Sequence, residues 1–189
     1  MKVIDLSAWQ EGIDMTQVKA EGVDGVIIKL GENMHETETA RTQIFDALDA
    51  GLKVGVYYFA RGKNVDELTA EGEWVVDKLK EIGLTDWHLQ LKCWLDYELE
   101  DYWSLTAQEN TNNITAFLNV VNKWLYNCGV YGSYSLLWDN TYLYSRLPWV
   151  PVWVAQYASQ CDYPNYYGWQ YTDSAQVAGH QVDCNEFAR

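Results

Sequence analysis

Hydrophobic residues in this chain form short continuous runs that alternate with stretches of helical spacing. Residues 24–30 (DGVIIKL) and 53–59 (KVGVYYF) are nearly continuous apolar runs, as expected for strands that are covered on both faces. Together with similar runs elsewhere they predict eight strands, at residues 3–9, 24–30, 53–59, 91–97, 129–134, 152–157, 166–171 and 180–183.

Helical patterns fill most of the gaps between the earlier strands. They predict helices at residues 14–21, 39–50, 65–82 and 106–127. In the third of these, apolar side chains recur every three or four residues until Gly83, which is typical of an amphipathic helix that ends at a glycine. The fourth begins at Thr106 with Glu109 three residues later, a spacing that predicts a capping box.

Strands and helices that alternate in this way indicate parallel β–α–β units. Eight strands are the usual number for closing a small barrel. Because helical patterns are few after the fifth strand, we expect an irregular TIM-like β/α barrel of about eight strands and about five helices, with helices sparse in the C-terminal third. Residues 1–189 are expected to form one domain. An open doubly wound sheet is the alternative, but no glycine-rich loop follows the first strand.

The charge balance narrows the class of partner. The chain has 13 basic and 27 acidic residues, a formal net charge of −14, and no cluster of Lys and Arg. Nucleic acids and anionic membrane surfaces are bound through basic patches, so neither is an expected partner. No apolar run approaches the roughly 20 residues of a membrane-spanning helix, so membrane insertion is not expected either.

The aromatic residues and the cysteines indicate which ligands the chain could bind. Ten Trp and fourteen Tyr supply flat apolar faces with a polar edge, which suit stacking on sugar rings as well as core packing. The four cysteines, at positions 93, 128, 161 and 184, form no CxxC pair, so no zinc site is expected. Free thiols are favoured over two disulfides, although the sequence allows both.

Carboxylates stand at the predicted strand ends. Asp96 and Glu98 close the fourth strand two residues apart, so they share one face with Cα atoms roughly 6.5 Å apart. Asp5 lies in the first strand and Asp183 at the end of the last. In a closed barrel the first and last strands are neighbours and the fourth lies across the mouth, where barrel enzymes carry their chemistry. We therefore expect the four carboxylates to converge.

Convergent carboxylates suit acid–base chemistry. Like charges in a low-dielectric cleft raise the pKa of at least one carboxyl group. A carboxyl group that stays protonated near neutral pH can protonate a glycosidic oxygen, so the pattern permits glycoside hydrolysis. Taken alone, it also allows an ordinary solvent-facing pair at positions 96 and 98, or a site for Mg²⁺ or Ca²⁺.

Seven segments carry a resemblance to a known family. They are residues 4–14 (IDLSAWQEGID), 22–29 (GVDGVIIK), 50–59 (AGLKVGVYYF), 95–98 (LDYE), 152–157 (VWVAQY), 169–171 (WQY) and 182–185 (VDCN). In order and spacing the chain resembles the glycoside hydrolase family 25 lysozymes along nearly its whole length. Residues 31–39 (GENMHETET) depart from that family's pattern of an aspartate and aromatic residues after the second strand.

The resemblance implies an N-acetylmuramidase that cleaves the β-1,4 bond between N-acetylmuramic acid and N-acetylglucosamine in peptidoglycan. It implies that Glu98 is the general acid. Asp96 is either a nucleophile or a support for the substrate's 2-acetamido group, and Asp5 and Asp183 tune the cluster and hold sugar hydroxyls. The candidate substrate-binding residues are Tyr57, Trp153, Gln156, Trp169 and Trp9. No metal or cofactor is expected.

Other functions remain open at this point. A non-catalytic wall- or glycan-binding module on the same fold is the main alternative, followed by a metal-dependent deacetylase and a chitinase-like barrel. The first residues, MKVIDLSAWQ, contain no apolar signal-peptide core and no cleavage site, so no Sec signal is expected. With peptidoglycan as its partner, the protein is expected to act as a monomer at the bacterial cell wall, outside the cytoplasm. A phage endolysin is one origin consistent with these features.

Overall fold

The computed structural model describes residues 1–125 and 128–188. Its elements are, in chain order, β1 (Lys2–Leu6), η1 (Ala8–Gln10), α1 (Met15–Ala20), β2 (Gly25–Glu32), β3 (His35–Glu36), α2 (Ala40–Asp49), β4 (Lys53–Phe59), α3 (Val65–Ile82), β5 (Cys93–Asp96), η2 (Glu100–Ser104), α4 (Ala107–Val121), β6 (Gly129–Ser133), η3 (Ser135–Asn140), α5 (Leu143–Arg146), β7 (Val152–Ala155), β8 (Gly168–Val177) and β9 (His180–Phe187). The segments η1 and η2 are 3-10 helices, and η3 is a π-helix.

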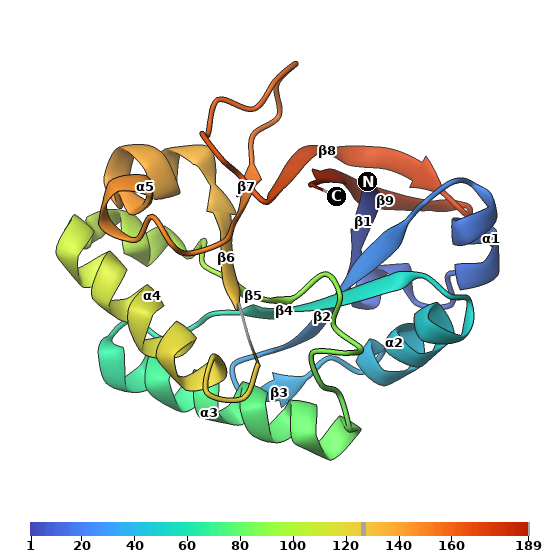
Figure 1. The fold of residues 1–189 in the computed structure, drawn as a ribbon, viewed down its shortest axis with the longest axis horizontal. Coiled ribbons are helices and arrows are strands. Elements are labelled where there is room, and N and C mark those ends of the chain that lie inside the picture. Colours follow the sequence, from blue (N-terminus) through green and yellow to red (C-terminus); the bar gives the residue numbers. More distant parts are fainter. Residues whose placement is uncertain (126–127, 189) are drawn as a thin grey trace.

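The strands close into a barrel (Figure 1). Their order is β1-β9-β8-β7-β6-β5-β4-β2, and a pairing between β1 and β2 completes the ring, with the two-residue β3 added beside β2. From β1 through β8 the ring strands run parallel, whereas β9 is antiparallel to both of its neighbours. The predicted irregular eight-stranded barrel is confirmed.

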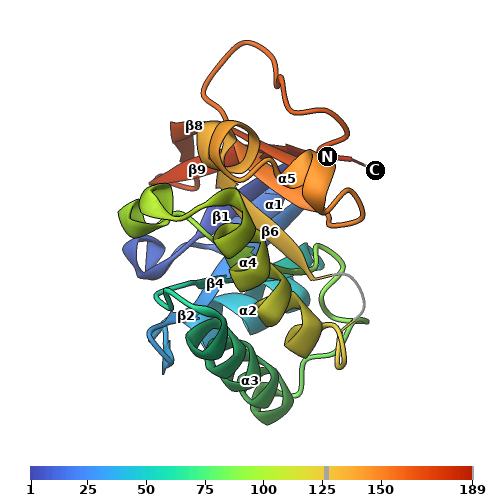
Figure 2. The same cartoon turned by 90° about the vertical axis from the view of Figure 1, so that its left-hand side faces the viewer.

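Helices cover only part of this barrel. The helices α3 and α4 pack against each other along one side, as both views show (Figures 1 and 2). Between β6 and β7 the chain forms only the short η3 and α5, and no helix of the described residues separates β7, β8 and β9. Helices are thus sparse in the C-terminal third, as predicted. Segments as short as η3 and α5 cannot show a helical period, which explains why the pattern did not predict them.

Several predicted boundaries are wrong. The first strand ends at Leu6 rather than at residue 9, because the next residues turn into η1, whose N-terminus carries its own capping box. The longest predicted helix begins at the expected capping box of Thr106 and Glu109 but ends at Val121. The end predicted for it, at residue 127, lies outside the described residues.

A hairpin of β8 and β9 closes the ring. Ala178 and Gly179, between the two strands, have φ angles of 49° and 80°. Two successive positive φ angles are typical of a type I′ turn, which joins antiparallel strands directly. The chain therefore reverses at this point, and β9 continues to Phe187, well beyond the predicted end at residue 183.

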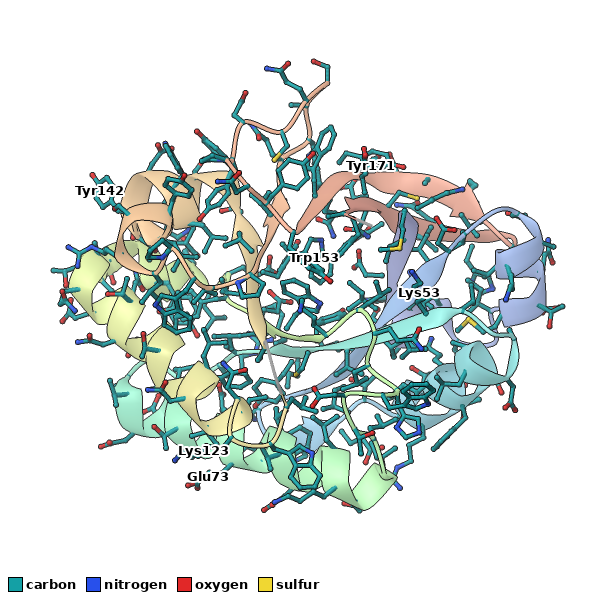
Figure 3. The ribbon with its side chains drawn as sticks, viewed as in Figure 1. Lys53, Glu73, Lys123, Tyr142, Trp153 and Tyr171 are labelled. Atoms are coloured by element: carbon teal, nitrogen blue, oxygen red, sulfur yellow. The ribbon has the colours of Figure 1, made fainter. Side chains whose placement is uncertain are left out.

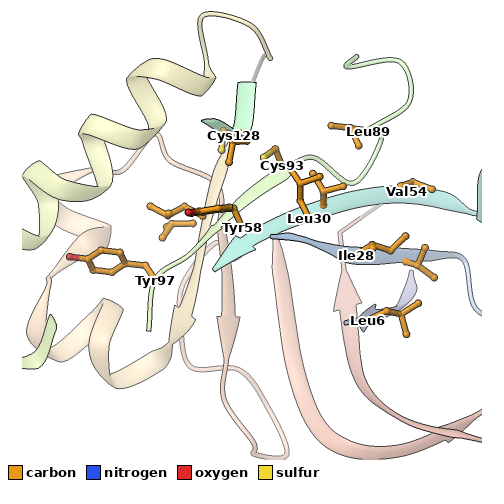
Figure 4. Packing of buried hydrophobic residues seen from close by; sticks show 14 of the residues in the cluster. Leu6, Ile28, Leu30, Val54, Tyr58, Leu89, Cys93, Tyr97 and Cys128 are labelled. Atoms are coloured by element: carbon orange, nitrogen blue, oxygen red, sulfur yellow. The ribbon is translucent and has the colours of Figure 1, made fainter. Parts of the chain in front are cut away.

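Two apolar layers hold the barrel together. Beneath the helices lies the outer layer, which includes Leu6, Ile28, Val54 and Tyr58 (Figure 4). Inside the ring lies a smaller cluster, formed by Val3, Ile27, Leu91, Trp94, Tyr131, Trp153 and Phe187. Figure 3 shows Trp153 within the ring of strands. These large side chains fill the interior near the amino ends of the parallel strands, which we call the base.

The four cysteines are free thiols, three of them buried, as the sequence favoured. Cys93 and Cys128 lie close together in the outer layer (Figure 4). The helices of the described residues include none with the length and hydrophobicity that a membrane span requires.

Candidate active site

Polar side chains occupy the end of the barrel opposite the base, which we call the mouth. Side chains two residues apart share one face of a strand, so the inward position that follows Val3 is Asp5 and the one that follows Trp94 is Asp96. Asp183 lies directly opposite Asp5 in the pairing of β1 with β9. The barrel therefore brings carboxylates from distant parts of the chain together.

Amide side chains donate hydrogen bonds to Asp5 and Asp183. Gln170 Nε2 donates to Asp5 Oδ2 at 3.1 Å and to Asp183 Oδ2 at 3.2 Å. Asn185 Nδ2 donates to Asp5 Oδ2 at 2.8 Å. Burial, and then the charge of Asp183, raises the pKa of Asp5 to about 7 in spite of these hydrogen bonds. Burial also raises the pKa of Asp183. Asp5 is therefore partly protonated at neutral pH.

Asp96 and Glu98 differ in how far they reach solvent. Asp96 is 4% exposed, and its Oδ1 has no hydrogen-bond partner among the described residues. Burial and the charges of Glu98 and Asp5 raise the pKa of Asp96 well above its usual range. Glu98 follows β5 with an exposed side chain, but the walls of the mouth still desolvate it, and this effect with the charge of Asp183 raises its pKa. Glu98 is thus the more accessible of two carboxyl groups that favour protonation.

A buried network fixes the segment that carries Glu98. The rings of Tyr97 and Tyr102 stack with centroids 3.7 Å apart. Tyr97 Oη donates to Asn110 Oδ1 at 2.7 Å, and Tyr102 Oη donates to the Gly62 carbonyl oxygen at 2.7 Å. Both rings are fully buried. The backbone on each side of Glu98 is therefore anchored to α4 and to the turn after β4.

Two cations face the carboxylates. Lys29 lies on β2 and Arg61 follows β4. The positive charges of both oppose the effect of burial, because they lower the pKa of Asp96 and of Glu98. The mouth therefore combines acidic side chains with Lys29 and Arg61, which together we call the basic wall.

Of the predicted substrate-binding residues, Tyr57 and Trp9 reach the mouth. Burial, followed by the charges of Asp5, Asp96 and Asp183 and then of Glu98, raises the pKa of Tyr57 well above its usual value. Its hydroxyl therefore stays protonated and can donate to a ligand. Trp9 is 91% exposed at the rim. It borders a hollow of about 370 Å³ that is also lined by Gln10, Asp173, His180, Gln181 and Asp183.

The other three do not offer free side chains at the mouth. Trp153 is 1% exposed, and its Nε1 donates to Asn185 Oδ1 at 2.8 Å. Trp169 packs in the outer layer beside a hollow of about 550 Å³ on the outside of the barrel, and its Nε1 donates to the Gln156 carbonyl oxygen at 2.7 Å. The Gln156 side chain exchanges two hydrogen bonds with Asp162, which hold the loop after β7.

Besides the two cations, sequence reasoning missed Gln170, Asn185 and Tyr131. Gln170 is 1% exposed, and its Oε1 accepts from Tyr131 Oη at 2.9 Å. A lone amide between two aromatic residues of a strand was a signal for Gln170, because buried polar groups need partners. Asn185 follows Asp183 by two residues and so shares its face. Tyr131 carried no signal, since tyrosines are common in cores.

The groups that contact the acids of this site are hydrogen-bond donors such as Gln170, which lies between Asp5 and Asp183. In the part of the chain that the structure describes, no group of three or more His, Cys, Asp or Glu side chains has the arrangement of a metal site. An accessible carboxyl group beside a buried one, both with raised pKa, is suited to proton transfer to a bound ligand.

The fold and the site together define an α/β barrel with a carboxylate-rich mouth at the carboxyl ends of its strands. Residues 4–180 match the pattern of glycosyl hydrolases family 25, and the chain belongs to this family.

Individual relatives agree with this assignment. The chain is 33% identical over 196 residues to the autolytic lysozyme of Clostridium acetobutylicum, in a match that covers 100% of this chain and 56% of that protein. The modular autolysin LytC from Streptococcus pneumoniae has a TM-score of 0.84 at 24% identity, over 97% of this chain and 46% of that one. The bacterial lysozyme from Streptomyces coelicolor has a TM-score of 0.81 at 24% identity, over 99% and 91%. This chain spans about half the length of the first two proteins.

Proposed function

We propose that this protein is an N-acetylmuramidase that hydrolyses the β-1,4 bond between N-acetylmuramic acid and N-acetylglucosamine in peptidoglycan. The observation that carries the proposal is the placement of Glu98, an accessible carboxyl group whose pKa is raised at the mouth of the barrel. Family membership and the names of the relatives, an autolytic lysozyme and a bacterial lysozyme, support a wall polysaccharide as the substrate.

Glu98 serves as the general acid in this proposal. Its proton passes to the glycosidic oxygen as the bond from that oxygen to the anomeric carbon breaks, and water then supplies a hydroxyl group to that carbon. The second proton of the water returns to Glu98, which restores the acid. Exposure at the mouth lets Glu98 reach a bound glycan, and its raised pKa keeps the proton available.

Asp96 supports the positive charge that develops at the anomeric carbon, either as a nucleophile or by orienting the 2-acetamido group of the substrate. Its buried Oδ1 has no partner among the described residues, so Asp96 keeps an acceptor that no other group of the site occupies. Asp5 and Asp183 share one amide donor, Gln170, and hold sugar hydroxyls from the opposite side. Tyr57 and Trp9 contact the glycan directly, whereas Trp153, Trp169 and Gln156 hold the surrounding frame.

The place of action follows from the substrate. We propose that the protein acts as a monomer at the bacterial cell wall, with peptidoglycan as its partner. The net charge of −14 gives no long-range attraction to an anionic wall, so binding depends on contacts within the mouth.

The decisive test compares wild type with Glu98→Gln. Turbidity loss of purified peptidoglycan and mass spectrometry of the fragments are measured for both, and Glu100→Gln, an exposed acid two residues away, is the matched control. We expect muramic acid at new reducing ends from wild type and Glu100→Gln, and a loss of at least about a hundredfold in rate for Glu98→Gln. Undiminished lysis by Glu98→Gln would show that Glu98 is not the general acid. No release by any of the three, with wall pelleting intact, would point to a non-catalytic wall-binding module.

A further inference from the structure

The basic wall of the mouth is built around one aromatic ring. Lys29 Nζ lies 5.1 Å and Arg61 Cζ 4.4 Å from the centroid of Phe59, so both cations pack on the same side chain. In the strand register Phe59 pairs with Glu32 on one side and with Asp96 on the other. The wall therefore adjoins the carboxylates directly.

Within this wall, positive charge exceeds negative charge. Lys29 Nζ lies 2.5 Å from Glu32 Oε2, and Arg61 Nη2 lies 3.4 Å from Glu32 Oε1. Two cations thus share one carboxylate, and the long contact of Arg61 leaves its guanidinium group weakly held. In a chain with 27 acidic and 13 basic residues, a net positive wall beside the carboxylates is a local exception.

The backbone below Arg61 is fixed. The N–H groups of Arg61 and Gly62 donate to Glu71 Oε1 at 3.0 and 2.9 Å, and Glu71 is only 4% exposed on α3. Tyr102 Oη holds the Gly62 carbonyl from the other side. In contrast, the Arg61 side chain is 43% exposed. A rigid stem with an accessible guanidinium group is the arrangement of a binding residue.

We propose that Lys29 and Arg61, held on Phe59, form a receptor for a carboxylate group of the substrate. The inference rests on the proposed function and adds a charge requirement to it. A guanidinium group matches the two oxygens of a carboxylate, and a neighbouring ammonium group adds a further charge-assisted hydrogen bond. In peptidoglycan the carboxylate can come from two sources, the lactyl group of a peptide-free muramic acid or the stem peptide.

The test uses soluble glycan strands in two forms, peptide-free and peptide-bearing, each with its carboxylates either free or converted to amides with a carbodiimide and ammonia. For wild type we expect kcat/KM to be roughly tenfold higher on free carboxylates than on amides, as one charge-assisted hydrogen bond allows. A preference seen with peptide-free strands identifies the lactyl group. A preference confined to peptide-bearing strands identifies the stem.

Variants then assign the preference to this wall. Arg61→Gln and Lys29→Met should bring the ratio of free to amidated substrate close to one, whereas Glu32→Gln, which removes the internal competitor, should raise it. Lys53→Met, on a side chain near Met1 at the base, and Arg146→Gln, on a side chain bonded to Gln108 on α4, should keep the wild-type ratio. The ratio cancels any shift in the pKa of Asp96 and Glu98 that the loss of a cation causes.

Two results would overturn the inference: a wild-type ratio of one on both kinds of strand, or an unchanged ratio in Arg61→Gln and Lys29→Met. Failure of the proposed function looks different, because wild type then cleaves no strand. In that case the same ratio is measured from dissociation constants of the soluble strands by tryptophan fluorescence, and it decides the inference without catalysis. Thermal melts establish that each variant is folded.

Discussion

Single residues in the mouth are distinguished by their surroundings rather than by their type. Asp5, Asp96 and Asp183 are all aspartates, yet Asp5 accepts hydrogen bonds from two amides while Asp96 has an oxygen with no partner among the described residues. Burial acts on every one of them and raises its pKa. The site therefore holds carboxyl groups whose charged form is disfavoured by burial first and by neighbouring charges second, and a proton relieves both effects.

The raised pKa of Asp5 predicts how stability depends on pH. The pKa of Asp5 is 3.8 in its ordinary state and about 7 in the folded protein. The folded state binds this proton more tightly than the unfolded chain, so the free energy of unfolding falls as pH rises from 3.8 to about 7. Asp5→Asn should reduce this dependence of the free energy of unfolding on pH. It should also raise the melting temperature at pH 8 and lower the activity.

The measurement is a series of thermal melts between pH 4 and pH 8 with circular dichroism. Asp46→Asn, which makes the same change of charge on an exposed residue of α2, is the control and should follow wild type. A lower melting temperature for Asp5→Asn than for wild type at pH 8 would show that the carboxylate stabilises the fold, contrary to the expectation.

At the scale of elements, the site depends on how neighbouring segments lock the loop after β5. The rings of Tyr97 and Tyr102 stack on each other, and Asn110 Oδ1 on α4 accepts a hydrogen bond from the hydroxyl group of Tyr97. Asn110 Nδ2 also donates to the Tyr102 carbonyl oxygen at 2.9 Å. One asparagine thus links both ends of the segment that contains Glu98.

Asn110→Ala should therefore affect both stability and catalysis. Removing a buried partner leaves polar atoms unsatisfied, at a cost of about 1–3 kcal/mol in the free energy of unfolding. Because Glu98 then loses its fixed position, kcat should fall more than KM rises. Chemical denaturation and steady-state kinetics measure the two effects. Asn112→Ala, on the exposed face of the same helix, should change neither, and equal behaviour of the two variants would refute the role given to Asn110.

The alternation of side chains between the two faces of a strand explains which parts of the site could be predicted from sequence. Asp96 and Glu98 stand two residues apart at the end of a predicted strand, so strand geometry predicted a shared direction for them, although β5 itself ends at Asp96. The same alternation could not predict which face of the sheet Trp153 and Trp169 occupy, because strands buried on both faces show no alternation of polar and apolar residues. Trp153 faces the barrel interior and Trp169 faces outward, and only the closed ring decides this.

The reversal of β9 was equally hard to anticipate. The turn residues Ala178 and Gly179 lack the Asn-Gly or Asp-Gly pair that marks most two-residue hairpins. The number of strands and their alternation with helices, in contrast, followed from the hydrophobic pattern. Local patterns therefore predicted the barrel and the four carboxylates and carried a signal for the two amides, whereas the place of Lys29 and Arg61 beside them depended on tertiary pairing.

For the whole molecule, closure of the ring depends on tight packing at the base. Gly168 on β8 pairs with Phe187 on β9, and the ring of Phe187 lies over the glycine. A methyl group added at position 168 would collide with that ring. The glycine is therefore required by space rather than by backbone conformation.

Gly168→Ala should destabilise the protein by about 1–3 kcal/mol through overpacking. In the double variant with Phe187→Leu, the smaller side chain makes room for the methyl group, so the combined loss should be less than the sum of the two single losses. Denaturant titrations of the four proteins give the coupling energy. Strict additivity would mean that the strand shifts to avoid the collision.

The antiparallel direction of β9 also decides where the chain ends lie. The N–H groups and carbonyls of Met1 and Phe187 exchange hydrogen bonds at 2.9 and 3.0 Å, and both views show the termini together (Figures 1 and 2). Since β1 starts and β9 finishes at the base, either terminus points away from the mouth. A tag used to immobilise the protein on a bead or a sensor surface can therefore be placed at either end, and in both orientations the mouth stays turned toward the solution.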